Sequence, residues 1–149
     1  NAVFALTPLA RTSASTLAFA QSLVDTLGAR PLVIDAERHD KIVATTSHLP
    51  FVIASALMST ADDQARDDEL LFRLVASGFR DTSRLAASDT TMMIDILLTN
   101  RANVASQLKS FSEHLDALAN LIDRADAEIL YTQLDRIAKT RRDILRRTA

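Results

Sequence analysis

The sequence predicts a mainly α-helical protein, in which a helical bundle domain follows a short β-α-β remnant of an α/β domain. Three observations support this fold class. The 149 residues include only two glycines and three prolines, which favours long helices joined by short connections. Short apolar segments that suit strands occur before residue 36. Beyond that point, apolar residues recur at steps of three and four, the spacing of amphipathic helices.

The first 36 residues are predicted to form a strand, a helix and a second strand. Residues 2–6 (AVFAL) are apolar and suit a buried strand. Thr12 or Ser13 can cap the following helix, and Gly28 stands where a left-handed residue ends it. Residues 30–35 form the second strand. Two strands and one helix do not make a stable sheet by themselves, so we interpret this segment as the end of an α/β domain.

Residues 39–58 (HDKIVATTSHLPFVIASALM) predict one long helix with almost no polar face. A helix that is apolar all round is enclosed by other elements, so we expect it at the axis of a bundle or in a subunit interface. Pro50 lacks the N–H that would bond the carbonyl of Thr46, which predicts a kink there. The apolar run is short for a membrane span and contains His48, so no membrane interaction is expected.

The rest of the chain is predicted to be helical apart from two interruptions. An acidic break is expected at residues 61–64, and a helix over residues 67–77 leads to an irregular segment over residues 78–84. Asp89 or Ser88 caps the next helix, which ends near residue 99. Asn100 caps another helix, and a final helix covers residues 127–147.

Composition and motif content exclude several kinds of site. The absence of cysteine excludes a disulfide framework and any cysteine-based metal site, and it fits a cytoplasmic protein. A net charge of −2 gives no reason to expect nucleic acid as a partner. His39 and His48 are nine residues apart, half a turn out of phase on a helix, so no shared metal is expected. We also find no glycine-rich dinucleotide loop, P-loop or nucleophile elbow.

The segment 78–84 (GFRDTSR) carries the strongest indication of a binding site. It places Arg80, Asp81 and Arg84 within seven residues, between two apolar helices. The planar guanidinium group of arginine suits two-point binding of a carboxylate or phosphate. The same charges could instead form surface ion pairs, which stabilise a protein little. The residue pattern leaves both interpretations open.

Several separated blocks, taken together, resemble the prephenate/arogenate dehydrogenase family. The blocks are His39-Asp40, Ser47-His48-Leu49-Pro50, residues 78–86 (GFRDTSRLA), Ser88-Asp89, and Asp95 with Asn100. Their order and spacing resemble the helical C-terminal domain of that family, and AVFALTP resembles the end of its nucleotide-binding domain. The resemblance therefore implies that residues 1–36 end a nucleotide-binding α/β domain. Residues 37–149 would form a helical dimerisation and substrate-binding domain.

The resemblance implies an NAD(P)-dependent oxidative decarboxylation of prephenate or arogenate in tyrosine biosynthesis, carried out by a homodimer joined through the helical domain. NAD or NADP would be bound mainly by the missing N-terminal domain, which also holds the family's catalytic histidine. No catalytic residue is therefore expected in this chain, and the fragment alone is expected to be inactive. Two alternatives stay open: the helical dimer domain of another NAD(P)-dependent dehydrogenase acting on a small acid, and a non-catalytic helical interaction module.

Matching residue by residue implies which side chains form the substrate site. They are Arg84, Asp81, His39, Gly78, Phe51 and Met93. Arg84 would bind a substrate carboxylate, Asp81 would position its partners, and His39 would line the pocket. Phe51 stands where some relatives have a second histidine, and Met93 stands where some have a tryptophan. Loss of the histidine removes a polar contact, so the choice between prephenate and arogenate is not assigned.

Overall fold

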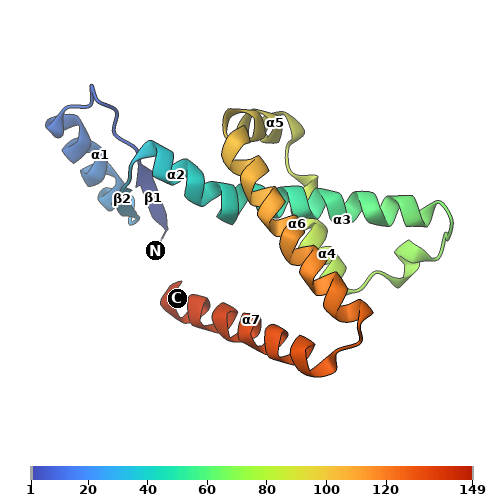
Figure 1. Cartoon of the computed structure of the whole chain (residues 1–149). Coiled ribbons are helices and arrows are strands. Elements are labelled where there is room, and N and C mark those ends of the chain that lie inside the picture. The colour runs from blue at the N-terminus through green and yellow to red at the C-terminus, as the bar shows by residue number, and fades with distance from the viewer. Residues whose placement is uncertain (1, 149) are drawn as a thin grey trace. The chain divides into compact units, whose positions relative to one another are not determined.

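The computed structural model describes residues 2–148, with side chains as far as Arg146 (Figure 1). The expected fold class is confirmed, because two short parallel strands joined by a helix precede a helical remainder. The elements in chain order are β1 (Val3–Leu6), α1 (Ala14–Thr26), β2 (Arg30–Val33), α2 (Ala36–Val43), the π-helical turn η1 (Ala44–His48), α3 (Leu49–Ala65), the 3₁₀ turn η2 (Leu71–Leu74), α4 (Ser77–Ser83), the 3₁₀ turn η3 (Arg84–Ala87), α5 (Thr90–Thr99), α6 (Arg101–Asp123) and α7 (Ala127–Thr148).

The β-α-β segment follows its sequence signals closely. The hydroxyl oxygen of Ser13 accepts a hydrogen bond from the backbone N–H of Thr16 at 3.1 Å and caps α1. Gly28 has a φ of +73° after the end of α1, the left-handed conformation that glycine adopts without steric cost. Val24 of α1 is buried, but Phe4 on β1 remains 54% exposed. The two strands therefore present apolar surface that α1 alone does not cover.

The helix predicted over residues 39–58 is longer than expected. It runs without a break from Ala36 to Ala65 through α2, η1 and α3, and its direction changes between α2 and α3 (Figure 1). In η1, the N–H of Leu49 bonds the carbonyl of Ala44, five residues earlier. Pro50 follows in the first turn of α3, where a missing N–H costs little. The distortion predicted at the proline thus takes the form of a π-helical turn just before it.

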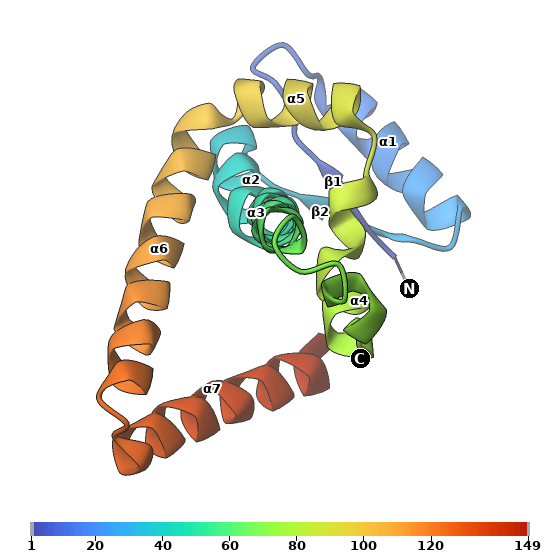
Figure 2. The same ribbon diagram turned by 90° about the vertical axis from the view of Figure 1, so that its right-hand side faces the viewer.

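Within one chain, the long helix is only partly enclosed. α3 packs against α4 and η3, which lie beside it in the view along its axis (Figure 2). Leu49, Ala54 and Ala61 are buried, while most other α3 side chains are half-buried or exposed. Among the described residues, Ala36–Ala65 is the one helix long and apolar enough to cross a membrane. The core helix of a soluble protein passes the same test of length and composition, so this finding is weak evidence for a membrane span.

The prediction of an acidic break at residues 61–64 is wrong, because α3 continues to Ala65. The guanidinium of Arg66 lies 3.2 Å from the carboxylate of Asp62 and 3.4 Å from that of Asp63. Ion pairs at spacings of four and three residues support a helix. The acidic residues therefore stabilise the last turn of α3.

The prediction of a helix over residues 67–77 is also wrong, since only the short turn η2 forms before α4 begins at Ser77. The side-chain oxygen of Asp68 accepts the N–H of Leu70 at 2.9 Å. Such a local hydrogen bond offers the backbone an alternative to helix, which explains why the apolar spacing did not suffice.

The segment 78–84, predicted to be irregular, is helical. α4 begins at Ser77, and η3 continues the chain from Arg84. The hydroxyl of Ser83 donates to the carbonyl of Phe79 at 2.7 Å, a contact between successive helical turns. Gly78 lies in the first turn of α4 and is followed by residues that all tolerate a helix, so one glycine does not prevent it.

The later helices begin and end where capping residues predict. The carboxylate of Asp89 accepts the N–H of Met92 at 2.7 Å and caps α5. Between α6 and α7, Ala125 has a φ of 51°, unusual for a residue with a side chain.

The chain divides into two compact units, one up to Gln107 and one from Leu108 onward. The domain boundary predicted after residue 36 stays a prediction.

Candidate functional site

Arg84 borders a hollow in the first unit. The cavity has a volume of about 510 Å³ and is lined by Met58 of α3 and by Arg80, Ser83, Arg84, Ala86 and Ala87 of α4 and η3. Its wall therefore consists of a methionine, small side chains and two arginines. This composition suits a small ligand with an apolar body and an anionic group.

The charged side chains of residues 78–84 form no ion pair with the described residues of the chain. Among the described residues, neither Arg80 nor Arg84 forms an ion pair, and Asp81 does not hold either arginine in place. All three side chains are exposed. A non-catalytic interaction module, whose arginines form only surface ion pairs, predicts an exposed Arg84 with no hollow beside it. Arg84 is exposed, but a cavity does lie beside it, so its binding role stays a prediction.

The other residues matched to the substrate site do not line this cavity. Gly78 is exposed in α4, and Met93 is buried in α5. Phe51 is half-buried, seven residues before Met58 and thus on the same face of α3. His39 lies on α2, with its side chain 35% exposed and its Nδ1 3.0 Å from the carboxylate of Asp40. The proposed roles of these residues stay predictions.

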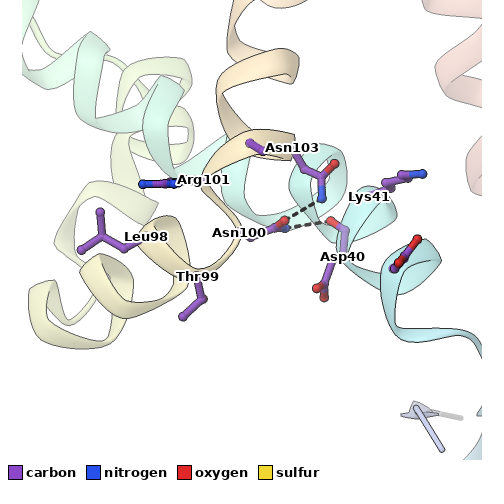
Figure 3. A pocket seen from close by; sticks show the side chains of 9 residues that line it. Asp40, Lys41, Leu98, Thr99, Asn100, Arg101 and Asn103 are labelled. Carbon is purple, nitrogen blue, oxygen red and sulfur yellow. Dashed lines mark hydrogen bonds between the residues drawn. The ribbon is translucent and has the colours of Figure 1, made fainter. Parts of the chain in front are cut away.

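A second hollow lies between α2 and the junction of α5 with α6 (Figure 3). It has a volume of about 370 Å³ and is lined by Glu37, Asp40, Lys41 and residues 98–103. The wall carries both acidic and basic groups, and Asn100 is the buried residue among them. His39 does not line this hollow.

Asn100 connects the two walls of this hollow. Its side-chain amide donates to the backbone carbonyl of Asp40 at 2.8 Å and lies 3.3 Å from Nδ1 of His48. Its own amide oxygen accepts a hydrogen bond from Asn103 at 2.8 Å (Figure 3). The predicted cap is therefore confirmed only in its backbone, where the carbonyl of Asn100 accepts the N–H of Val104. The side chain of Asn100 serves a tertiary contact instead.

His48 is buried, with 9% of its surface exposed. Burial lowers the pKa of His48, because the charged imidazolium loses its hydration. The carboxylate of Asp40 acts in the opposite direction, and His39 adds to the lowering. Both His48 and Asn100 stand out in the sequence, but nothing in the sequence connects them. Fifty-two residues separate the pair in the chain, so no local pattern could reveal their contact.

The described residues contain no group of three side chains that could hold a metal ion. The connection between β1 and α1, residues 7–13, contains no glycine. A dinucleotide pyrophosphate needs glycines there, so that the backbone can approach it closely. These residues therefore do not fit the phosphate loop of an NAD(P) site.

These observations define a class of protein in which a helical domain with an arginine-lined cavity follows a short parallel β-α-β segment. Residues 35–136 match the family model described as prephenate dehydrogenase, dimerization domain, and the chain belongs to that family.

Relatives and solved structures agree with this assignment. The chain is 34% identical over 110 residues to prephenate dehydrogenase of Lactococcus lactis, covering 74% of this chain and 31% of the relative. It is 33% identical over 137 residues to cyclohexadienyl dehydrogenase of Zymomonas mobilis, covering 91% and 47%. Prephenate dehydrogenase from Aquifex aeolicus, solved with hydroxyphenyl propionate and NAD⁺, superimposes with a TM-score of 0.88 at 31% identity, covering 95% of this chain and 50% of that one.

The chain spans half or less of the length of the curated relatives that it matches. Arogenate dehydrogenase of Synechocystis gives the same result in three dimensions. It superimposes with a TM-score of 0.82 at 28% identity, covering 95% of this chain and 52% of that structure. The described residues therefore correspond to about one half of such an enzyme.

Proposed function

We propose that the full-length protein oxidises prephenate or arogenate with NAD or NADP, and that this chain supplies substrate-binding and dimerisation surfaces. Membership of the dimerization-domain family supports this proposal. The relative that was solved with hydroxyphenyl propionate and NAD⁺ supports an aromatic acid and a nicotinamide cofactor as ligands of the full-length protein.

The observation that carries the substrate-binding role is the cavity beside Arg84. The guanidinium groups of Arg80 and Arg84 reach an open hollow without an internal carboxylate to neutralise them. A substrate carboxylate would gain charge-assisted hydrogen bonds there, which are stronger than those between neutral groups. Arg84 binds the carboxylate in this proposal. Asp81, Gly78, His39, Phe51 and Met93 complete the substrate site in the assembled enzyme.

The nicotinamide cofactor supplies hydride acceptance when it is bound. Residues 7–13 lack the glycines of a phosphate loop, so the cofactor is held mainly by a part of the full-length protein outside this chain. Residues 1–36 would form the last part of that nucleotide-binding domain. The exposed apolar side chains on both strands, Val3, Phe4, Leu32 and Val33, support further strands or helices covering this sheet.

A homodimer joined through the helical domain explains the exposed apolar side chains of α6 and α7. Along α6, Leu108, Leu115 and Ile122 are spaced by seven residues and are 40%, 50% and 64% exposed. Along α7, Leu134, Ile137 and Ile144 are similarly exposed. Large apolar side chains that recur exposed along one face of a helix indicate a protein–protein interface. We therefore assign these helix faces, together with the half-buried α3, to the contact with a second copy.

The experiment that tests the proposed function is a substrate panel with the full-length protein. Prephenate, arogenate and unrelated small hydroxy acids are each offered with NAD and with NADP, and reduction of the cofactor is followed. Turnover of prephenate or arogenate alone is expected. Turnover of another acid would favour a different dehydrogenase, and no turnover with any substrate would favour a non-catalytic interaction module.

A further inference from the structure

The hydrogen bonds around Asn100 fix the orientation of its side-chain amide. Asn103 donates to the oxygen of Asn100 at 2.8 Å, so the NH₂ group of Asn100 must face the other way. There it meets two acceptors, the backbone carbonyl of Asp40 at 2.8 Å and Nδ1 of His48 at 3.3 Å. Both N–H bonds of the amide are therefore committed.

This arrangement determines the protonation of His48. Because an N–H of Asn100 points at Nδ1, that nitrogen must offer a lone pair, and the proton of the neutral ring resides on Nε2. Nε2 has no hydrogen bond among the described residues, and no side-chain nitrogen or oxygen there is both sealed from solvent and unpartnered. Nε2 therefore keeps some contact with solvent and can carry its proton without cost.

A second proton on His48 is incompatible with the bonded arrangement. It would place an N–H on Nδ1 directly opposite an N–H of Asn100. Rotation of the Asn100 amide would relieve this conflict, but it would turn the amide oxygen away from Asn103. It would also remove the bond from Asn100 to the carbonyl of Asp40, which would keep only the N–H of Ala44 from its own helix. Protonation of His48 and the bond that holds α2 thus exclude each other.

The charged groups around His48 come mainly from one element. Asp40 and His39, both on α2, face the ring with opposite effects on its charge. Lys41 of α2 and Arg101 of α6 line the adjacent hollow with Asn100. η1 carries no other titratable side chain, and α3 carries none before Asp62. Burial and His39 therefore oppose the imidazolium, while the carboxylate of Asp40 favours it.

We propose that His48 and Asn100 form a proton-sensitive latch: neutral His48 keeps α2 bonded to the α5–α6 junction, and protonated His48 releases it. Both are positioning residues: Asn100 bonds α2 directly, and His48 acts on α2 through Asn100. α2 also carries His39, so the latch controls where that side chain stands. Only this last consequence, for substrate binding, rests on the proposed function.

Hydrogen exchange in the full-length protein tests the latch without any substrate. Exchange of the α2 amides is compared with exchange of the α1 amides at about pH 7.5 and about pH 5.5, each corrected for its intrinsic rate. On acidification we expect α2 to lose protection relative to α1 by roughly tenfold, the size expected for loss of one buried hydrogen bond. α1 serves as reference because it lies outside the latch.

The variant His48→Asn distinguishes the effect of protonating residue 48 from the effect of its packing. Its amide oxygen can occupy the place of Nδ1 and accept from Asn100, but it cannot take up a proton. We expect α2 in this variant to show the same protection at both pH values. His39→Asn is the matched control, since it removes the other histidine, whose charge acts on His48, and it should keep the response to acid.

Two results would overturn the proposal. One is loss of α2 protection on acidification in His48→Asn as large as in the parent. The other is an NMR spectrum at neutral pH in which Nδ1 of His48, rather than Nε2, carries the proton. A substrate assay is not needed for either result, so failure of the latch is distinguishable from failure of the proposed function.

Discussion

The side-chain amide of Asn100 donates to the backbone carbonyl of Asp40 at 2.8 Å, although sixty residues separate the two in the chain. This bond ties the first part of the long helix to the start of α6. Asn100 and its neighbour His48 are both buried, with 8% and 9% of their surface exposed. A single amide therefore satisfies polar groups on α2, η1 and α6 at once.

Asn100→Ala should lower the free energy of unfolding by about 1–3 kcal/mol, because it leaves Nδ1 of His48 without its donor and removes one of the two hydrogen bonds to the Asp40 carbonyl, which keeps the N–H of Ala44. Urea denaturation of the full-length protein measures the change. Asn120→Ala, at an exposed position on α6, is the matched control and should change stability by less than about 0.5 kcal/mol. Equal effects of the two substitutions would show that the Asn100 contacts do not stabilise the fold.

Stability should fall as the pH is lowered through the titration range of His48. Burial lowers the pKa of His48 below the ordinary value of about 6.5, so the unfolded chain binds a proton before the folded one does. The stabilisation is therefore complete above the unfolded pKa and is lost as the pH falls through the folded pKa. Urea midpoints measured across this range should decline less steeply in His48→Asn. An unchanged slope in that variant would contradict the prediction.

Ala125→Gly should stabilise the protein by about 0.5–1 kcal/mol, because the residue has a φ of 51° and glycine adopts this conformation without steric cost. The N–H of residue 125 bonds the carbonyl of Ile122 and is kept by glycine. Thermal and urea unfolding measure the gain. Ala105→Gly, at an exposed position inside α6, should have the opposite sign, and a loss of stability in both variants would refute the explanation.

Leu115→Glu should weaken the homodimer, because it would bury a charge among apolar side chains of the proposed contact. Leu115 is 50% exposed in the single chain and shares its helix face with Leu108 and Ile122. Sedimentation velocity should show a shift from dimer toward monomer at a given concentration. Asn120→Glu, on the far side of α6, should leave the dimer intact. A Leu115→Glu protein as dimeric as its parent would remove this face from the interface.

The sequence was sufficient to predict the elements that depend on local signals. Ser13, Gly28 and Asp89 end or begin helices where their side chains or conformations require. The wrongly predicted helix boundaries lie where apolar spacing competes with specific side-chain contacts. The ion pairs of Asp62 and Asp63 with Arg66 support the last turn of α3, and the hydrogen bond of Asp68 limits the next helix to a turn.

The candidate site was predictable only in part, for a physical reason. Arg84 could be singled out because its segment combines charges between apolar helices, and the family resemblance gave it a role. The contact of Asn100 with His48 depends on how α2 and α6 pack, which no spacing within either helix encodes. The cavity beside Arg84 likewise depends on Met58 of α3, twenty-six residues away in the sequence.

The most direct test of the substrate-binding role is the KM of the full-length protein carrying Arg84→Ala, measured with whichever of prephenate or arogenate the parent uses. Loss of a charge-assisted bond to a carboxylate costs about 1.5–3 kcal/mol, which predicts a KM roughly 10- to 100-fold higher. Arg66→Ala, which removes an exposed arginine already paired with Asp62 and Asp63, should leave KM unchanged. A KM for Arg84→Ala within about twofold of the parent would contradict the assignment of Arg84 to the substrate carboxylate.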